Sequence, residues 1–135
     1  IALHGHAGAF LPDLESLVAP LGTFEWIADE TLFHALTALV GSGPAFLFRF
    51  IEALAAAGAD LGLPEDQALR LARAMVDGAA ALAAQAAEAP MALVDKVASA
   101  GGTTRAGLDV LDPSLNALML ATLEAAARRS RELAA

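Results

Sequence analysis

The chain has 135 residues, no cysteine and a net charge of −8, with eight Lys and Arg in total. So few cations argue against a nucleic acid or an anionic membrane as the main partner, and the lack of cysteine excludes disulfides and thiolate metal sites. Apolar residues make up 57% and charged residues 18%, against a usual charged share of about 25%, so we expect another subunit or domain to cover part of the surface.

The N-terminal segment differs in kind from the rest of the chain. Its pattern predicts a short strand at 1–3, a helix at 11–22 with Pro12 in its first turn, and a second strand at 24–28. We interpret this αβ segment, which has no sheet to join, as the end of another domain. Since the sequence does not begin with methionine, we expect it to be part of a longer protein. We expect Trp26 to pack its strand against the helices.

From Asp29 onward the apolar spacing predicts about six helices and no strand. Asp29 is expected to cap the first helix, and Ser42 or Gly43 the second, with Pro44 in its first turn. The second helix is apolar on several sides, so we expect it to be buried on several sides.

The longest uncharged stretch, Thr31 to Phe48, has the length of a membrane span. The sequence Gly41 to Pro44 breaks it in the middle. This break favours two shorter soluble helices.

Proline and glycine bound the remaining helices. One helix is expected to start at 64–66 and a short one at Pro90. After a Gly-Gly-Thr-Thr break, the pattern predicts a short helix at 103–111, a turn at 112–114 and a last helix at 115–133.

The sequence SAGGTTRAGL, residues 99–108, interrupts this helical pattern. Gly101 and Gly102 permit backbone angles that side chains forbid, and they let a ligand approach the main chain. The helix that follows has unpaired N–H groups and a positive dipole end, which suit a carboxylate. The neighbouring Ser and Thr hydroxyls can donate or accept hydrogen bonds. A plain corner between two helices, capped by threonine, explains the same residues.

Three segments, taken together, resemble pyrroline-5-carboxylate reductase. They are TALVGSGPAFLFRFIEALAAAGADLGLP, KVASAGGTTRAGL and EAAARRSREL, in this order and at about this spacing. The resemblance covers residues 11–133 and implies that residues 1–28 end a dinucleotide-binding domain. Residues 29–135 would form a helical dimerisation and substrate-binding domain. The expected fold class is therefore all-α, a helical dimerisation bundle preceded by a short αβ remnant of a Rossmann-like domain.

The family reduces 1-pyrroline-5-carboxylate to L-proline with a hydride from NADPH or NADH, so the resemblance implies this step of proline biosynthesis for the full-length protein. It also implies a cytoplasmic homodimer with interlocked helices, which can assemble into a decamer, and neither a nucleic acid nor a membrane partner. No G-x-G-x-x-G/A fingerprint occurs in the sequence. We therefore expect another domain to hold most of the cofactor, and this chain alone to be inactive.

The resemblance also assigns roles at the glycine-rich loop. The N–H groups around Gly101, Gly102 and Thr103 would bind the substrate carboxylate. The hydroxyl of Thr104 would face the ring nitrogen, which makes it the expected catalytic residue. Ser99 would support the loop or touch the carboxylate.

A cofactor contact is expected at Gly43 and Pro44, which would wall the nicotinamide end of the site, although a helix start explains them equally well. The chain departs from the family's usual pattern at three places. Ala100 stands where proline is usual, Val40 where serine is common, and Phe46 where tyrosine is common. The loop around Ala100 is therefore expected to be less rigid.

Other polar residues have plainer interpretations. Glu88 could approach the substrate amine and Lys96 its carboxylate, but both are expected to be solvated surface residues. No metal site is expected, because the histidines have no identifiable metal-ligand partners. These are His4, His6 and His34.

Two other functions stay open from sequence. One is a related imine reductase that acts on another cyclic imino acid, which substrate profiling would distinguish. The other is a non-catalytic helical assembly module, which would lack a glycine-rich βαβ segment upstream. The sequence does not separate NADPH from NADH, or a dimer from a decamer.

Overall fold

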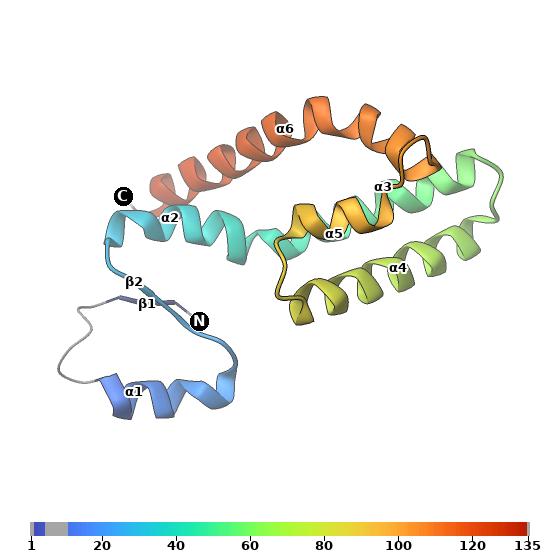
Figure 1. Ribbon diagram of the computed structural model, residues 1–135. Coiled ribbons are helices and arrows are strands. Elements are labelled where there is room, and N and C mark those ends of the chain that lie inside the picture. Colours follow the sequence, from blue (N-terminus) through green and yellow to red (C-terminus); the bar gives the residue numbers. More distant parts are fainter. Residues whose placement is uncertain (1, 5–10, 135) are drawn as a thin grey trace. The chain divides into compact units, whose positions relative to one another are not determined.

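A computed structural model describes residues 2–4 and 11–134 of the chain (Figure 1). The described residues are mostly helical, with two short strands near the N-terminus, which confirms the all-α class with a small αβ segment before it. The chain divides into two compact units, one formed by Ile1–Gly41 with Leu123–Ala135 and the other by Ser42–Thr122. The domain boundary expected after residue 28 does not coincide with this division and stays a prediction.

The two strands form a small parallel sheet. Strand β1 (Ala2–His4) pairs with β2 (Glu25–Ile27), and Leu3 lies opposite Trp26. Helix α1 (Leu11–Val18) connects them, as parallel neighbours require a crossover. The expected helix and strands are thus confirmed. The expectation that they have no sheet to join is wrong, because the two strands pair with each other.

Trp26 holds β2 against α1. Its indole N–H donates a hydrogen bond of 3.0 Å to Oε1 of Glu15, on the helix. The 3₁₀ turn η1 (Ala19–Leu21) continues α1 and is followed by Gly22, whose φ of +116° few other residues adopt. This confirms the predicted helix end.

The helical stretch after β2 changes its winding along its length. It begins as the 3₁₀ turn η2 (Glu30–Leu32), continues as α2 (Phe33–Leu36) and ends as the π-helical η3 (Thr37–Gly41). Asp29 caps it as predicted, because its Oδ1 accepts a 2.9 Å hydrogen bond from the N–H of Thr31.

Helix α3 (Gly43–Asp60) starts at the predicted place. Pro44 lies in its first turn, where a missing N–H costs nothing. Ser42 precedes the helix with nearly helical angles, φ −92° and ψ −21°, and its side chain makes no capping hydrogen bond. The predicted break therefore separates two helical elements without forming a reversing turn at Ser42.

By length and composition alone, Glu30–Asp60 is apolar enough to cross a membrane, with a mean hydropathy of 1.4 over its best window. Only 6% of that window is buried within the chain. A helix this apolar and this exposed needs cover from lipid or from another protein surface.

Helix α4 (Glu65–Gln85) packs along α3 (Figure 1). The link between them contains Gly62 with φ +103°, and α4 starts after Pro64 as predicted. Small residues bring the two helices together. A Cβ built on Gly58 of α3 would lie 3.5 Å from the Cβ of Ala68 on α4.

The buried residues of the described chain are small. No large side chain is fully buried in the part that the structure describes. The exposed fraction of Phe48 is 67%, so the expected burial of α3 on several sides is not met within this chain. The buried residues are Val18, Ala38, Ala55, Ala68, Ala72, Ala98 and Ala127.

Helix α5 (Pro90–Val97) begins at the predicted proline, and α6 (Thr103–Ala134) begins directly after the glycines. The turn predicted at 112–114 is wrong, because α6 continues through Pro113. A proline inside a helix loses one hydrogen bond and crowds the carbonyl four residues earlier, which bends a long helix without ending it. Figure 1 shows that α6 is bent.

The close approach of α3 and α4 leads to a stability prediction at Gly58. We expect Gly58→Ala to be tolerated, because its Cβ would make ordinary contacts at 3.5 Å with Ala68 and Leu63. Gly58→Leu should overpack the pair and lower the free energy of unfolding by about 1–3 kcal/mol. Thermal unfolding of the full-length protein would measure both. Equal melting temperatures for the Ala and Leu variants would contradict close packing at this position.

Candidate functional site

A tight turn joins α5 to α6. The N–H of Gly102 donates a 3.0 Å hydrogen bond to the carbonyl of Ser99, which closes a four-residue turn. Gly101, its third residue, has φ +71°. Ala100 has no positive φ, because none of the described non-glycine residues has one. A negative φ followed by a positive φ is the type II pattern, which requires glycine or asparagine at the third position.

The turn favours glycine at residue 102 because Ser99 leaves little room for a Cβ there. A Cβ built on it would lie 2.6 Å from Oγ of Ser99 and 3.2 Å from the carbonyl oxygen of Ser99. The Ser99 hydroxyl therefore lies directly over the glycine. A side chain at residue 102 would require the Ser99 hydroxyl to rotate away and the Ser99 carbonyl to shift slightly.

Helix α6 begins on this turn. The carbonyl of Gly102 accepts a 3.2 Å hydrogen bond from the N–H of Ala106, so Gly102 is the N-cap. The N–H groups of Thr103 and Thr104 then have no acceptor within the helix and lie at its positive dipole end. Both threonines are exposed. This arrangement suits a small anion such as a carboxylate.

The structure shows which N–H groups of the turn already make a hydrogen bond. The N–H of Gly102, which was expected to help bind a carboxylate, donates to the carbonyl of Ser99, and its role in binding stays a prediction. A β-turn uses the N–H of its fourth residue, and Gly102 occupies that position. The N–H groups of Thr103 and Thr104 are the donors that the helix end presents instead.

Sequence reasoning missed Arg105. Its Nη2 lies 3.5 Å from the carbonyl oxygen of Ala98 and 3.5 Å from Oδ1 of Asp95 on α5. The available signal was an arginine in the first turn of a helix, where the dipole disfavours a cation. Such a residue needs a partner elsewhere.

Gly43 and Pro44 are the first two residues of α3. A Cβ on Gly43 would meet nothing within 4 Å, and Pro44 is exposed. Among the described residues, no hydrogen bond or ion pair joins them to the turn that precedes α6. Their cofactor role stays a prediction.

Lys96 and Glu88 are surface residues, as expected: Lys96 donates a 2.5 Å hydrogen bond to Glu88, and both side chains are exposed. Nδ1 of His34 lies 3.0 Å from the hydroxyl of Ser130. His4 lies in β1, and His6 lies outside the described residues. Within the described ranges, no group of three or more His, Cys, Asp or Glu could hold a metal ion.

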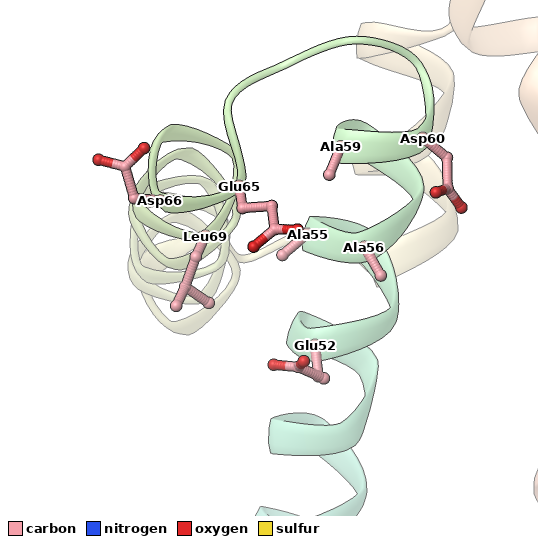
Figure 2. Close-up of a pocket in the computed structure, with 8 residues that line it drawn as sticks. All are labelled: Glu52, Ala55, Ala56, Ala59, Asp60, Glu65, Asp66 and Leu69. Carbon is pink, nitrogen blue, oxygen red and sulfur yellow. The ribbon is translucent and has the colours of Figure 1, made fainter.

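An open hollow of about 510 Å³ lies between α3 and the start of α4 (Figure 2). Figure 2 shows Glu65 extending toward α3, whereas Asp66 points away from it. Carboxylates dominate the polar lining, so the hollow repels an anionic ligand. It does not contain the turn that precedes α6. Its lining residues are Glu52, Ala55, Ala56, Ala59, Asp60, Glu65, Asp66 and Leu69.

The turn and the start of α6 are therefore the part of the described chain best suited to an anionic small molecule. The turn fixes the direction of the first helical N–H groups, and the threonine hydroxyls add polar contacts beside them. The arrangement offers binding and orientation. Among the described residues, no hydrogen bond or ion pair joins a carboxylate or histidine to Thr103 or Thr104.

The steric limit at Gly102 can be tested directly. We expect Gly102→Ala to lower the free energy of unfolding by about 1–3 kcal/mol, because its Cβ would meet the backbone and hydroxyl of Ser99. Gly107→Ala is the matched control, since a Cβ at this position of α6 meets nothing within 4 Å. Thermal unfolding would compare the two. If both variants melt at the same temperature, the crowding at Ser99 is not a real constraint.

Comparison with known proteins adds an independent result. The family model for pyrroline-5-carboxylate reductase dimerisation matches residues 30–133. A pyrroline-5-carboxylate reductase from Arabidopsis thaliana is 49% identical over 107 residues, which are 78% of this chain and 39% of that protein.

Solved structures agree. A pyrroline-5-carboxylate reductase from Coxiella burnetii matches with a TM-score of 0.88 and 33% identity, over 98% of this chain and 50% of that one. A pyrroline carboxylate reductase from Plasmodium falciparum with NADP bound matches with a TM-score of 0.79 and 27% identity, over 91% of this chain and 49% of that one. This chain therefore spans half or less of each of these relatives.

The matched segment contains α3 to α5 and the turn on which α6 begins, so the similarity covers the candidate site as well as the helices around it. The family model also covers well over half of the chain. The resemblance inferred from sequence is confirmed: the chain belongs to the pyrroline-5-carboxylate reductase dimerisation family.

Proposed function

We propose that this chain is the dimerisation and substrate-binding part of an enzyme that reduces 1-pyrroline-5-carboxylate to L-proline with NADPH or NADH. In this proposal, residues 1–28 end the dinucleotide-binding domain and residues 29–135 form the helical domain. The observation that carries the proposal is a helix starting on a type II turn, at residues 99–104, inside the segment that matches the family.

The substrate carboxylate would lie at the start of α6. The N–H groups of Thr103 and Thr104 would donate to it, and the dipole end of the helix would favour its charge. Gly101 and Gly102 would allow the ligand to come close to the main chain. Ser99 would hold the turn through its carbonyl, which the N–H of Gly102 contacts at 3.0 Å.

Thr104 would orient the reacting bond. Reduction of a C=N bond adds a hydride to carbon and leaves the nitrogen with its proton. With the carboxylate at the helix start, the Thr104 hydroxyl would accept a hydrogen bond from the protonated ring nitrogen. The protein's contribution is then alignment of the ring, which needs no general base.

Bound NADPH or NADH would supply the hydride. The chain does not fit a whole dinucleotide, because its sequence lacks the glycine-rich turn that holds a pyrophosphate. Gly43 and Pro44 offer an open surface at the start of α3 without a charged group of their own. We therefore assign them only the wall beside the nicotinamide, and the rest of the nucleotide to another part of the full-length protein.

A homodimer would cover the apolar helices. Within the described residues the core is built from alanines and one valine, while Leu71 and Met75 of α4 are about half exposed. Together with Leu54 and Leu63 they line an apolar groove of about 240 Å³ beside α3. A dimerisation family favours a second copy over lipid as the cover for Glu30–Asp60.

The function is tested by oxidation of NADPH and NADH by the full-length protein in the presence of pyrroline-5-carboxylate. We expect turnover by the wild type. Thr104→Ala should lower kcat/KM roughly tenfold to a hundredfold, because one hydrogen bond to a charged group is lost. Thr104→Ser keeps the hydroxyl and should retain most of the activity.

Thr122→Ala is the matched control for this experiment. Thr122 lies on the same helix, and its hydroxyl donates to the carbonyl of Leu118, far along the sequence from the turn. This variant should leave kcat/KM unchanged. A folded wild type that binds NADPH without reducing pyrroline-5-carboxylate would contradict the proposal. Turnover of another cyclic imine would then support a related reductase, and no turnover an assembly module.

The quaternary structure gives a separate prediction. At micromolar concentration we expect the protein to sediment as a dimer or a larger assembly. Leu71→Glu, which puts a charge on the apolar groove, should shift it toward monomer, whereas Arg73→Glu on exposed α4 surface should not. A stable wild-type monomer, or equal dissociation of both variants, would count against an interface at this groove.

A further inference from the structure

Arg105 bridges the two helices on either side of the candidate site. It is the third residue of α6, and its guanidinium reaches back to α5. Nη2 lies 3.5 Å from the carbonyl oxygen of Ala98, the C-cap of α5, and 3.5 Å from Oδ1 of Asp95. The side chain of Arg105 is 38% exposed and that of Asp95 is 71% exposed. The Arg105 side chain therefore links the first turn of α6 to the end of α5.

The contacts with α5 explain why an arginine is favourable at residue 105. A cation in the first turn of α6 faces the positive end of that helix dipole, which is unfavourable. The end of α5 is the opposite case, because its last carbonyls lack partners within the helix and attract a cation. The guanidinium thus lies within reach of a carbonyl at the end of α5, at 3.5 Å, while the backbone of Arg105 begins α6.

We propose that Arg105 is a positioning residue for the turn at residues 99–104. By tying the end of α5 to the first turn of α6, it fixes the direction of the N–H groups of Thr103 and Thr104. Its guanidinium is engaged with Asp95 and Ala98, so it acts through the turn and not by touching the substrate. This inference rests on the proposed function in naming the ligand that the turn holds.

The geometry offers a second way to restrain the same turn. Ala100 is the second residue of a type II turn, the position that proline favours. Its φ is not positive, and within the described part of the chain its N–H makes no hydrogen bond that proline would remove. Ala100→Pro should therefore stiffen the turn without help from Arg105.

The experiment compares the full-length wild type with Arg105→Ala, Ala100→Pro and the double variant. We expect Arg105→Ala to raise the KM for pyrroline-5-carboxylate about threefold to tenfold, because an ion pair and a charged hydrogen bond are lost. The KM for NADPH should stay the same. The double variant should recover most of the imino-acid KM, which loss of general stability would not explain.

Arg73→Ala is the matched control, because Arg73 is exposed on α4 and makes no ion pair within the described residues. It should behave as the wild type. If Arg105→Ala fails to fold, Asp95→Asn offers a milder test, because it removes only the charge of the carboxylate that pairs with Arg105. This variant should raise the KM for the imino acid about twofold. An unchanged KM in these variants, or equal changes in both KM values without rescue by proline, would overturn the proposal.

Hydrogen exchange separates this inference from the proposed function. The amides of Gly102 and Ala106, which donate the hydrogen bonds that close the turn and begin α6, should exchange several times faster in Arg105→Ala than in the wild type and slow again in the double variant. If the wild type does not reduce pyrroline-5-carboxylate, the assigned reaction fails, yet this change in exchange would still support the positioning role of Arg105. Unchanged exchange would refute that role even in an active enzyme.

Discussion

The constraint on which this structure depends is that its helices meet through small side chains. Gly58 of α3 lies against Ala68 of α4, and the buried apolar residues are alanines apart from Val18. Such contacts allow close approach but bury little apolar area, and burial at about 25 cal/mol per Å² is what stabilises a fold. Several large side chains of α3 and α4, among them Phe48, Leu71 and Met75, stay exposed. Stability must then come largely from a surface outside this chain.

Residues with small side chains also form the candidate site. A turn of four residues with two glycines ends one helix and starts the next, and the hydrogen bond from Gly102 to Ser99 decides which N–H groups remain available. Because that bond uses the N–H of Gly102, the free donors are those of the helix itself. The anion donors of the candidate site are therefore backbone N–H groups, and their direction depends on how firmly α5 and α6 are held together.

Local chemistry made much of this structure predictable. The side chain of Asp29, the prolines at 44, 64 and 90, and the glycine pair before Thr103 each act within a few residues, so the helix starts were predicted correctly. The incorrect predictions arose where a longer helix overrode a local preference, or where the contact joins residues far apart in the sequence. Pro113 disfavours a helix locally, but α6 extends for several turns on both sides of it and continues. The pairing of β1 with β2 joins segments more than twenty residues apart, which no local pattern specifies.

Arg105 shows why the candidate site was only partly readable from sequence. The glycines and threonines predicted a helix start beside a turn, since both follow from backbone preferences. The partner of Arg105 depends on where α5 lies relative to α6, which no pattern of neighbouring residues in the sequence specifies. In a chain whose interior contacts are mostly alanine, long polar side chains at helix ends are among the few groups able to fix the angle between helices. An arginine that opposes its own helix dipole is consistent with such a role, because the cost at α6 is offset at the end of α5.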